Sequence, residues 1–233
     1  MRLDKFLCDC GIGSRKEVHN LLKNNKVTVN DIIVKSKDYD INQKEDIVCV
    51  NEIKVEYEEF HYIMMHKPSN YVTSTKDKDQ TVMELLGEFA KYKVAPVGRL
   101  DKDTEGLLLF TDDGILAHFL TSPKHHVEKK YYAKLQDKID PKCIELFKQG
   151  IVLEDGYQAL PSTLEIIDDY HIYLTIVEGK FHQVKRMLEA VNNKVIFLKR
   201  ITFGPLHLDD KLKIGTVRKL TEEEVNSLLK YKK

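Results

Sequence analysis

The sequence contains few cysteines and no long apolar run. Four cysteines in 233 residues fit neither the paired spacing of a zinc site nor a disulfide framework, so free thiols are expected. No apolar stretch approaches the roughly 20 residues that span a bilayer. The chain starts with M-R-L-D-K-F-L-C, which is too charged for a signal peptide. We therefore expect a cytoplasmic protein that does not contact a membrane.

Signatures of cofactor binding are also missing. The sequence has neither a phosphate-binding glycine-rich loop nor a dinucleotide-binding fingerprint. The adjacent histidines His125 and His126 have no cysteine or carboxylate cluster at ligand spacing beside them. We therefore expect neither a metal nor a cofactor.

The chain lacks a net charge, because 37 basic residues balance 37 acidic ones. The distribution is nevertheless uneven. Residues 1–37 hold eight basic residues against four acidic ones, whereas residues 38–60 hold eight acidic residues against two lysines. Local basic patches that could meet nucleic acid are therefore compatible with overall neutrality.

A chain of this length can bury a sizeable core and still carry a second, small domain. Apolar spacing over residues 3–7 predicts a first helix that ends at Gly11. Ser14 and Glu17 have the spacing of a capping box, which predicts a second helix to about residue 24. Apolar triplets on both sides of Asn30-Asp31 predict a tight hairpin. Two short helices and a hairpin make one small module.

The rest of the chain alternates between strand and helix patterns. Apolar runs predict strands at 61–65, 107–110, 166–167 and 172–177, and a β pattern ends at Leu135. Helical spacing predicts helices at 81–86, 115–120, 141–150 and 184–191, and a last one that Thr221 and Glu224 cap.

The most informative stretch runs from Gly98 to Gly114. Asp101 precedes the apolar run 107–110, and the edge of a buried strand would hold its carboxylate rigidly. On general grounds, an aspartate at such a position is more often a turn or capping residue than a catalytic one. The residue types alone therefore leave both readings of Asp101 open.

A second informative stretch lies between Lys180 and Arg200, where six basic residues accompany one acid, Glu189. Apolar residues stripe one face of the predicted helix and leave Lys185 and Arg186 off the core. A solvated charged face would explain this pattern as well as a binding surface would.

Both stretches resemble signatures of the pseudouridine synthases. The first reads G-R-L-D-K-D-T-E-G-L-L-L from Gly98, and the second reads H-Q-V-K-R-M from His182. The S-P-K-H-H-V-E-K-K-Y segment from Ser122, between the two signatures, is similar to the subfamily that modifies small-subunit ribosomal RNA. The N-terminal segment, with R-L-D-K-F-L and G-I-G-S-R-K-E, resembles the S4 RNA-binding domain.

This resemblance implies an α+β fold. We expect a small S4-like domain over residues 1–56 and a catalytic domain over residues 57–233, built on a mixed, largely antiparallel sheet with flanking helices. Three residues stand where these families usually have glycine, namely Asn25, Asp31 and Asn70. Asn and Asp tolerate positive φ better than most residues, so we expect them to keep the same backbone path.

The resemblance also assigns roles to individual residues. It implies that Asp101 is the nucleophile, that Lys185 pairs with this carboxylate and keeps it ionised, and that Tyr131 lies against the target base. It implies RNA contacts for Arg99, Arg15, Lys16, Lys23 and Arg186. We expect His125 and His126 to face RNA or to be structural.

The function expected from the resemblance is the isomerisation of one uridine in 16S ribosomal RNA, the family's uridine-516 site, by a monomer. The substrate is either the naked RNA or an assembling small-subunit particle. The alternatives are a synthase for 23S ribosomal RNA and a non-catalytic RNA-binding assembly factor. A hydrolase that uses Asp101 on a nucleoside would instead release free uracil.

Overall fold

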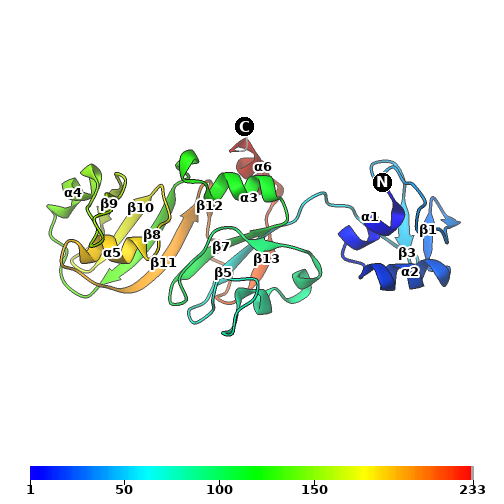
Figure 1. The fold of residues 1–233 in the computed structure, drawn as a ribbon, viewed down its shortest axis with the longest axis horizontal. Helices are drawn as coiled ribbons and strands as arrows, with labels where there is room; N and C mark the ends of the chain where they lie inside the picture. The colour runs from blue at the N-terminus through cyan, green and yellow to red at the C-terminus, as the bar shows by residue number, and fades with distance from the viewer. Residues whose placement is uncertain (232–233) are drawn as a thin grey trace. The chain divides into compact units, whose positions relative to one another are not determined.

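The computed structural model describes residues 1–231, which fold as two compact units (Figure 1). The first comprises Met1–His61 and Glu88–Val94, and the second comprises Tyr62–Gly87 and the chain from Ala95 onward. No helix in the described part of the chain is both long and apolar enough to cross a membrane.

The first unit includes two segments beyond the predicted domain boundary at residue 56. Aromatic side chains in these segments form stacking contacts. Tyr57 stacks on Phe6 of the N-terminal core, with ring centroids 5.4 Å apart. His61 stacks on Tyr92 at 3.7 Å. Residues 57–61 and 88–94 are therefore part of the N-terminal unit.

The first unit packs two helices, α1 (Leu3–Asp9) and α2 (Arg15–Lys23), against a small sheet. The predicted capping box at the start of α2 is confirmed, because Ser14 and Glu17 each bond the other's backbone N–H. The sheet has the order β2-β1-β3-β4. Its strands are β1 (Val27–Val29), β2 (Ile32–Ile33), β3 (Val48–Val50) and β4 (Ile53–Lys54).

The expected backbone at the three substituted glycine positions is confirmed. Asn25, Asp31 and Asn70 have φ values of 56°, 65° and 70°. The predicted hairpin at Asn30-Asp31 is confirmed too, with Val29 paired to Ile32 across the turn. Short polar side chains thus supply the left-handed backbone that glycine would supply.

The second unit is built on a nine-stranded sheet with the central order β13-β5-β7-β11-β8-β10-β9, while β6 pairs with β7 and β12 with β11. The pairing of β7 with β11 is parallel and the other pairings are antiparallel. The strands are β5 (Tyr62–Lys67), β6 (Ala95–Pro96), β7 (Glu105–Thr111), β8 (Lys129–Leu135), β9 (Thr163–Ile166), β10 (His171–Ile176), β11 (Val195–Phe203), β12 (Leu206–His207) and β13 (Val217–Lys219).

Gly106 allows β7 and β11 to approach each other. This residue pairs with Arg200 and has a φ of 109°. A Cβ at this position would overlap the backbone carbonyl of Arg200 and lie 2.6 Å from its backbone nitrogen. The glycine of the first signature is therefore needed because a side chain at this position would prevent β7 and β11 from pairing.

Helices flank the sheet. Leu116 and Leu120 of α3 and Leu228 of α6 share one buried cluster with residues of β5 and β7, while α4 contacts β9. Figure 1 shows α5 near β8, β10 and β11. The bounds are α3 (Gly114–Thr121), α4 (Cys143–Gln149), α5 (Gln183–Glu189) and α6 (Glu222–Lys230).

Three short 3-10 helices are the remaining elements. η1 (Val82–Leu85) and η3 (Pro123–His125) belong to the second unit, whereas η2 (Gly87–Lys91) lies mostly in the segment 88–94 of the first unit. The helix predicted over 81–86 is thus only a single 3-10 turn. Its N-terminus is capped as a helix would be, by Thr81 and Glu84. The positive φ of 55° at Gly87 changes the backbone direction directly after it.

Candidate active site

The loop that carries Asp101 connects β6 to β7 and is held by a buried lysine. Lys67, the last residue of β5, is fully buried. Its Nζ lies 2.9–3.3 Å from four backbone carbonyl oxygens, those of Pro68, Asp101, Lys102 and Thr104. Burial lowers the pKa of Lys67 to about 8, although the carboxylates of Asp103 and Asp101 oppose the shift. One ammonium group therefore fixes the path of the backbone around Asp101.

The segment that follows Lys67 adds further bonds to the same loop. The Thr73 hydroxyl donates to the Leu100 carbonyl at 2.8 Å and accepts from the Leu100 N–H at 3.2 Å. The Asn70 N–H donates to the Lys102 carbonyl at 2.7 Å. The strand predicted over 61–65 stops before Lys67, and the sequence assigned this lysine no role. A lysine within an apolar strand was the available signal, because an ionised group is rarely fully buried without partners.

Lys185 lies between two carboxylates of the Asp101 loop. Its Nζ is 3.1 Å from Oδ2 of Asp101 and 2.6 Å from Oδ1 of Asp103. Burial of Lys185 lowers its pKa, but the hydrogen bonds with Asp103 and Asp101 outweigh that effect and leave the pKa raised. Burial likewise opposes ionisation of Asp103, yet the bond from Lys185 leaves its pKa lowered. The ammonium of Lys185 therefore stays charged and faces Asp101.

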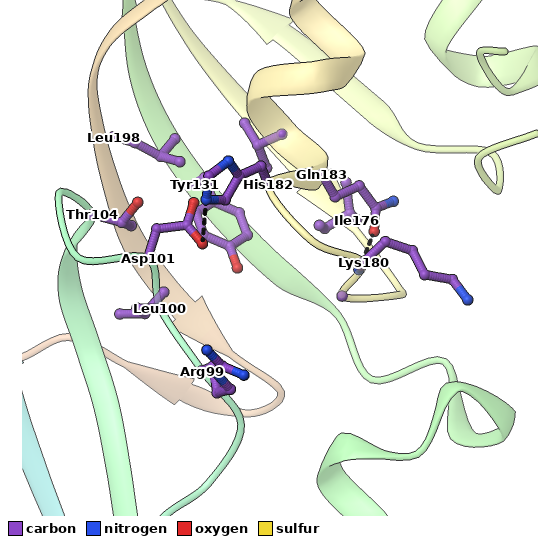
Figure 2. A pocket seen from close by; sticks show the side chains of 12 residues that line it. Arg99, Leu100, Asp101, Thr104, Tyr131, Ile176, Lys180, His182, Gln183 and Leu198 are labelled. Atoms are coloured by element: carbon purple, nitrogen blue, oxygen red, sulfur yellow. Dashed lines mark hydrogen bonds and ion pairs between the residues drawn. The ribbon is translucent and has the colours of Figure 1, made fainter. Parts of the chain in front are cut away.

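His182 approaches the other carboxylate oxygen of Asp101. Its Nε2 lies 3.8 Å from Oδ1, and Figure 2 shows the side chains of Asp101, Tyr131 and His182 directed toward one another. His182 has a φ of 49° and directly precedes α5. The sequence analysis assigned no role to this histidine, although it begins the second signature.

Gln183 explains another position of that signature. It is buried, its Oε1 accepts from the Lys180 N–H at 2.8 Å, and its Nε2 donates to Glu178 at 2.7 Å. Glu178 also accepts from the Tyr157 hydroxyl and the Leu160 N–H. These bonds fix the loop between β10 and α5, which carries His182 beside Asp101.

Two adjoining cavities border Asp101. The smaller, of about 60 Å³, has apolar walls at Leu100, Ile176, Val184 and Leu198 (Figure 2). The larger, of about 490 Å³, falls in the range of about 300–1,000 Å³ that is usual for small-molecule sites. Arg99, Asp101, Tyr131 and His182 line both.

Two polar side chains beside Asp101 can meet a ligand. Tyr131 is 7% exposed and lies on β8, whereas Tyr132 contacts Tyr173 and Phe197 on the opposite face, as the strand alternation predicts. Thr104 lines the smaller cavity, and its buried hydroxyl has no hydrogen-bond partner within residues 1–231. The site thus combines an aromatic ring, a carboxylate and a free hydroxyl.

The structure brings Asp101, Tyr131, Lys185 and Arg99 together, whereas the other predicted RNA contacts lie elsewhere. Arg15, Lys16 and Lys23 are exposed on α2 of the N-terminal unit. Arg186 pairs with Asp155, whose pKa is lowered by this hydrogen bond. The RNA-binding roles of these residues remain predictions.

The described residues contain no group of three or more His, Cys, Asp or Glu side chains placed to hold a metal ion. His125 stacks on Phe119 with ring centroids 3.7 Å apart, and His126 adopts a left-handed backbone with a φ of 48°. Both side chains are exposed, and the prediction that they face RNA or are structural stays a prediction.

Comparison with known families identifies the family of this chain. The family model RNA pseudouridylate synthase matches residues 61–190, and the S4 domain model matches residues 1–48. The chain therefore belongs to the RNA pseudouridylate synthase family, and it is a pseudouridine synthase with an N-terminal S4 domain. The predicted α+β fold and the predicted resemblance are confirmed.

Individual relatives and one solved structure are similar to this chain over nearly its whole length. The chain is 45% identical to ribosomal small subunit pseudouridine synthase A of Vibrio cholerae, over 99% of this chain and 100% of that protein. It is 44% identical to an uncharacterized RNA pseudouridine synthase of Bacillus subtilis, over 98% of both chains. A crystal structure of pseudouridylate synthase, 38% identical, matches 98% of this chain and 99% of that chain with a TM-score of 0.70.

Proposed function

We propose that the protein converts one uridine of small-subunit ribosomal RNA to pseudouridine, at the site numbered uridine 516 in 16S RNA, with Asp101 as the nucleophile. The observation that carries the proposal is the placement of Asp101. Its carboxylate lies 3.1 Å from the Lys185 ammonium and borders a cavity of about 490 Å³ that Tyr131 also lines. Relatives named for the small subunit support the choice of RNA.

The reaction needs a carboxylate and no co-reactant. The bond between C1′ and N1 of uridine breaks, the base turns, and C1′ bonds to C5. The proton lost from C5 is balanced by one gained at N1. Asp101 takes part in this reaction either by attacking C1′ or by assisting elimination to a glycal. In both cases the Lys185 ammonium stabilises the negative charge on the carboxylate before the reaction.

The uridine must leave its stack to reach Asp101, at a cost of roughly a few kcal/mol. Stacking of the base on Tyr131 would recover part of it, since such contacts are worth about 1–3 kcal/mol per base. Arg99 is exposed at the edge of both cavities, where it can occupy the space that the flipped nucleotide leaves.

The test incubates the pure protein with 16S and 23S transcripts in parallel and maps pseudouridine by carbodiimide-blocked primer extension. Asp101→Asn and Asp103→Asn form a matched pair, because each removes one carboxylate that contacts Lys185. We expect a single new stop at uridine 516 of 16S RNA that Asp101→Asn abolishes and Asp103→Asn retains.

The other outcomes separate the alternatives. A stop confined to 23S RNA would reassign the target, and pseudouridine formation retained in Asp101→Asn would contradict the nucleophile assignment. Free uracil would indicate hydrolysis. If neither naked RNA is modified, the assay is repeated on small-subunit assembly particles. Binding without modification there as well would favour a non-catalytic assembly factor.

A further inference from the structure

The larger cavity beside Asp101 has two buried cations in its lining, Lys129 and Arg200, that the reaction chemistry does not use. They are 9% and 2% exposed. Lys129 Nζ and the Arg200 guanidinium carbon lie 5.6 Å and 4.8 Å from the ring centroid of Phe203, so both cations gather around one aromatic side chain. Lys129 lies on β8 and Arg200 on the neighbouring strand β11.

Neither cation has an acidic partner in the described part of the chain. Within residues 1–231, Lys129 Nζ donates to the Val127 carbonyl at 2.7 Å and Arg200 Nε to the Leu107 carbonyl at 2.8 Å, and neither forms an ion pair. The Arg200 Nη2 atom is buried and has no partner among these residues. Buried charges are normally paired, so this arrangement lacks an anion.

The electrostatics agree with that conclusion. Burial, together with the nearby positive charge of Arg200, lowers the pKa of Lys129 to about 8, and Glu178 opposes the shift only weakly. Glu178 itself accepts bonds from Tyr157, Leu160 and Gln183. A bound anion would therefore be stabilised by two cations that form no ion pair with a carboxylate within residues 1–231.

We propose that Lys129 and Arg200 form a phosphate-binding subsite that holds a phosphodiester group of the RNA strand beside the flipped uridine. This inference rests on the proposed function, because the phosphate is that of the substrate. The cavity has the volume for a nucleotide and its phosphate, and Asp101 and Tyr131 line the same cavity. A neutral uracil carbonyl would leave both charges uncompensated, whereas a phosphate offers oxygens for the Arg200 fork and the Lys129 ammonium.

The matched variants are Lys129→Met and Lys130→Met. The two lysines are adjacent on β8, but Lys130 pairs with Glu165 and does not line the cavity. Both variants remove one positive charge, so a general loss of charge affects them equally. Arg200→Lys keeps the charge but removes the fork, and thermal unfolding checks that each variant folds.

The first measurement is the affinity of Asp101→Asn protein for a 16S fragment that contains the mapped uridine, across a range of KCl concentrations. We expect Lys129→Met to weaken binding about tenfold, the value of one charge-assisted hydrogen bond. The slope of log K against log salt should fall by about 0.7, the change for one phosphate contact on a single strand. Lys130→Met should change the affinity and the salt slope less than Lys129→Met does. A neutral methylphosphonate next to the target uridine should abolish the difference in affinity between the two variants.

A second measurement is independent of RNA. Inorganic phosphate is titrated into wild-type protein while the Lys129 ammonium is followed by NMR, and phosphate binding should raise its pKa. If wild-type protein forms pseudouridine but Lys129→Met binds RNA as Lys130→Met does, the proposal is overturned. If phosphate shifts Lys129 while RNA affinity is unchanged, the occupant is a free anion and the RNA assignment fails. If no RNA is modified but phosphate still shifts Lys129, the proposed function fails and the anion site stands.

Discussion

Lys185 contacts two carboxylates, which differ in their distance from the ammonium and in their exposure to solvent. The bond to Asp103 is shorter, at 2.6 Å against 3.1 Å for Asp101, but Asp103 lies largely in solvent, with 67% of its side chain exposed. Screening by water weakens an exposed pair. Asp103 therefore orients the ammonium, which also contacts the less exposed Asp101.

Replacing Lys185 by Met is expected to lower kcat about 10²–10³-fold with little change in KM, because a preorganised charge acts on the reacting carboxylate. Lys185→Arg keeps the charge and should recover part of the loss. Single-turnover pseudouridine formation measures both variants. An equal loss in Lys185→Arg and Lys185→Met would show that shape rather than charge matters at this position.

Lys67 makes stability depend on pH in an unusual direction. Its pKa is about 8 in the folded protein, below the ordinary 10.5, so between these values the unfolded chain binds more protons. The free energy of unfolding should therefore rise with pH from 8 toward 10.5, by up to about 1.4 kcal/mol per pH unit from this residue. Lys129, with a pKa of about 8, acts in the same direction.

Urea unfolding at several pH values between 7.5 and 10 measures this dependence. Lys67→Met should reduce the slope by the contribution of one group, whereas Lys44→Met, which removes an exposed lysine, controls for the loss of charge. An unchanged slope in Lys67→Met would contradict the assignment. The same variant should also lower activity, because four carbonyls around Asp101 lose their donor.

At the scale of elements, the pairing of β7 with β11 depends on one glycine. Gly106→Ala should lower the free energy of unfolding by about 3 kcal/mol or more, since a Cβ would overlap the Arg200 backbone and the φ of 109° is strained for alanine. Gly114→Ala is the matched control, because Gly114 begins α3 and has nothing within 4 Å of an added Cβ. Its effect should stay within about 0.5 kcal/mol. Urea unfolding of both variants measures the two changes in the free energy of unfolding.

Local elements were predictable because their causes are local. The capping box at Ser14, the hairpin at Asn30-Asp31 and the buried strand before Thr111 follow from neighbouring residues. The long-range pairings were not predictable, because the residues of a single segment do not indicate its partner strand. This holds for the pairing of β13 with β5 and for the parallel pairing of β7 with β11. For the same reason the sequence assigned no role to Lys67, whose partners lie 34 to 37 residues away in the catalytic loop.

At the scale of the whole molecule, the predicted RNA contacts Arg15, Lys16 and Lys23 lie in the first unit, whereas Asp101 lies in the second. Lys16 and Lys23 are seven residues apart on α2, so they lie on one face of the helix, and Arg15 begins it. If this face contacts phosphates, the Arg15→Gln/Lys16→Gln/Lys23→Gln variant should raise KM for 16S RNA and leave kcat unchanged. The salt dependence of binding should fall by about 0.7–0.9 for each lost contact.

The control for that variant is Lys44→Gln/Lys54→Gln, which removes exposed charge from the acidic segment of the same unit. Steady-state kinetics at two KCl concentrations distinguish the two proteins. A lower kcat with unchanged KM in the α2 variant would place these residues outside substrate binding.

The parallel pairing of β7 with β11 also sets when the protein can become active during its synthesis. The hydrogen bond from Arg200 to Leu107 joins residues 93 apart, and the one between His66 and Leu212 joins residues 146 apart. Pairings between such distant segments form late and slowly, because long loops must close first. The cavity beside Asp101 cannot assemble before β11 has left the ribosome. A partly synthesised chain can thus carry a folded S4 domain while its catalytic unit is still inactive.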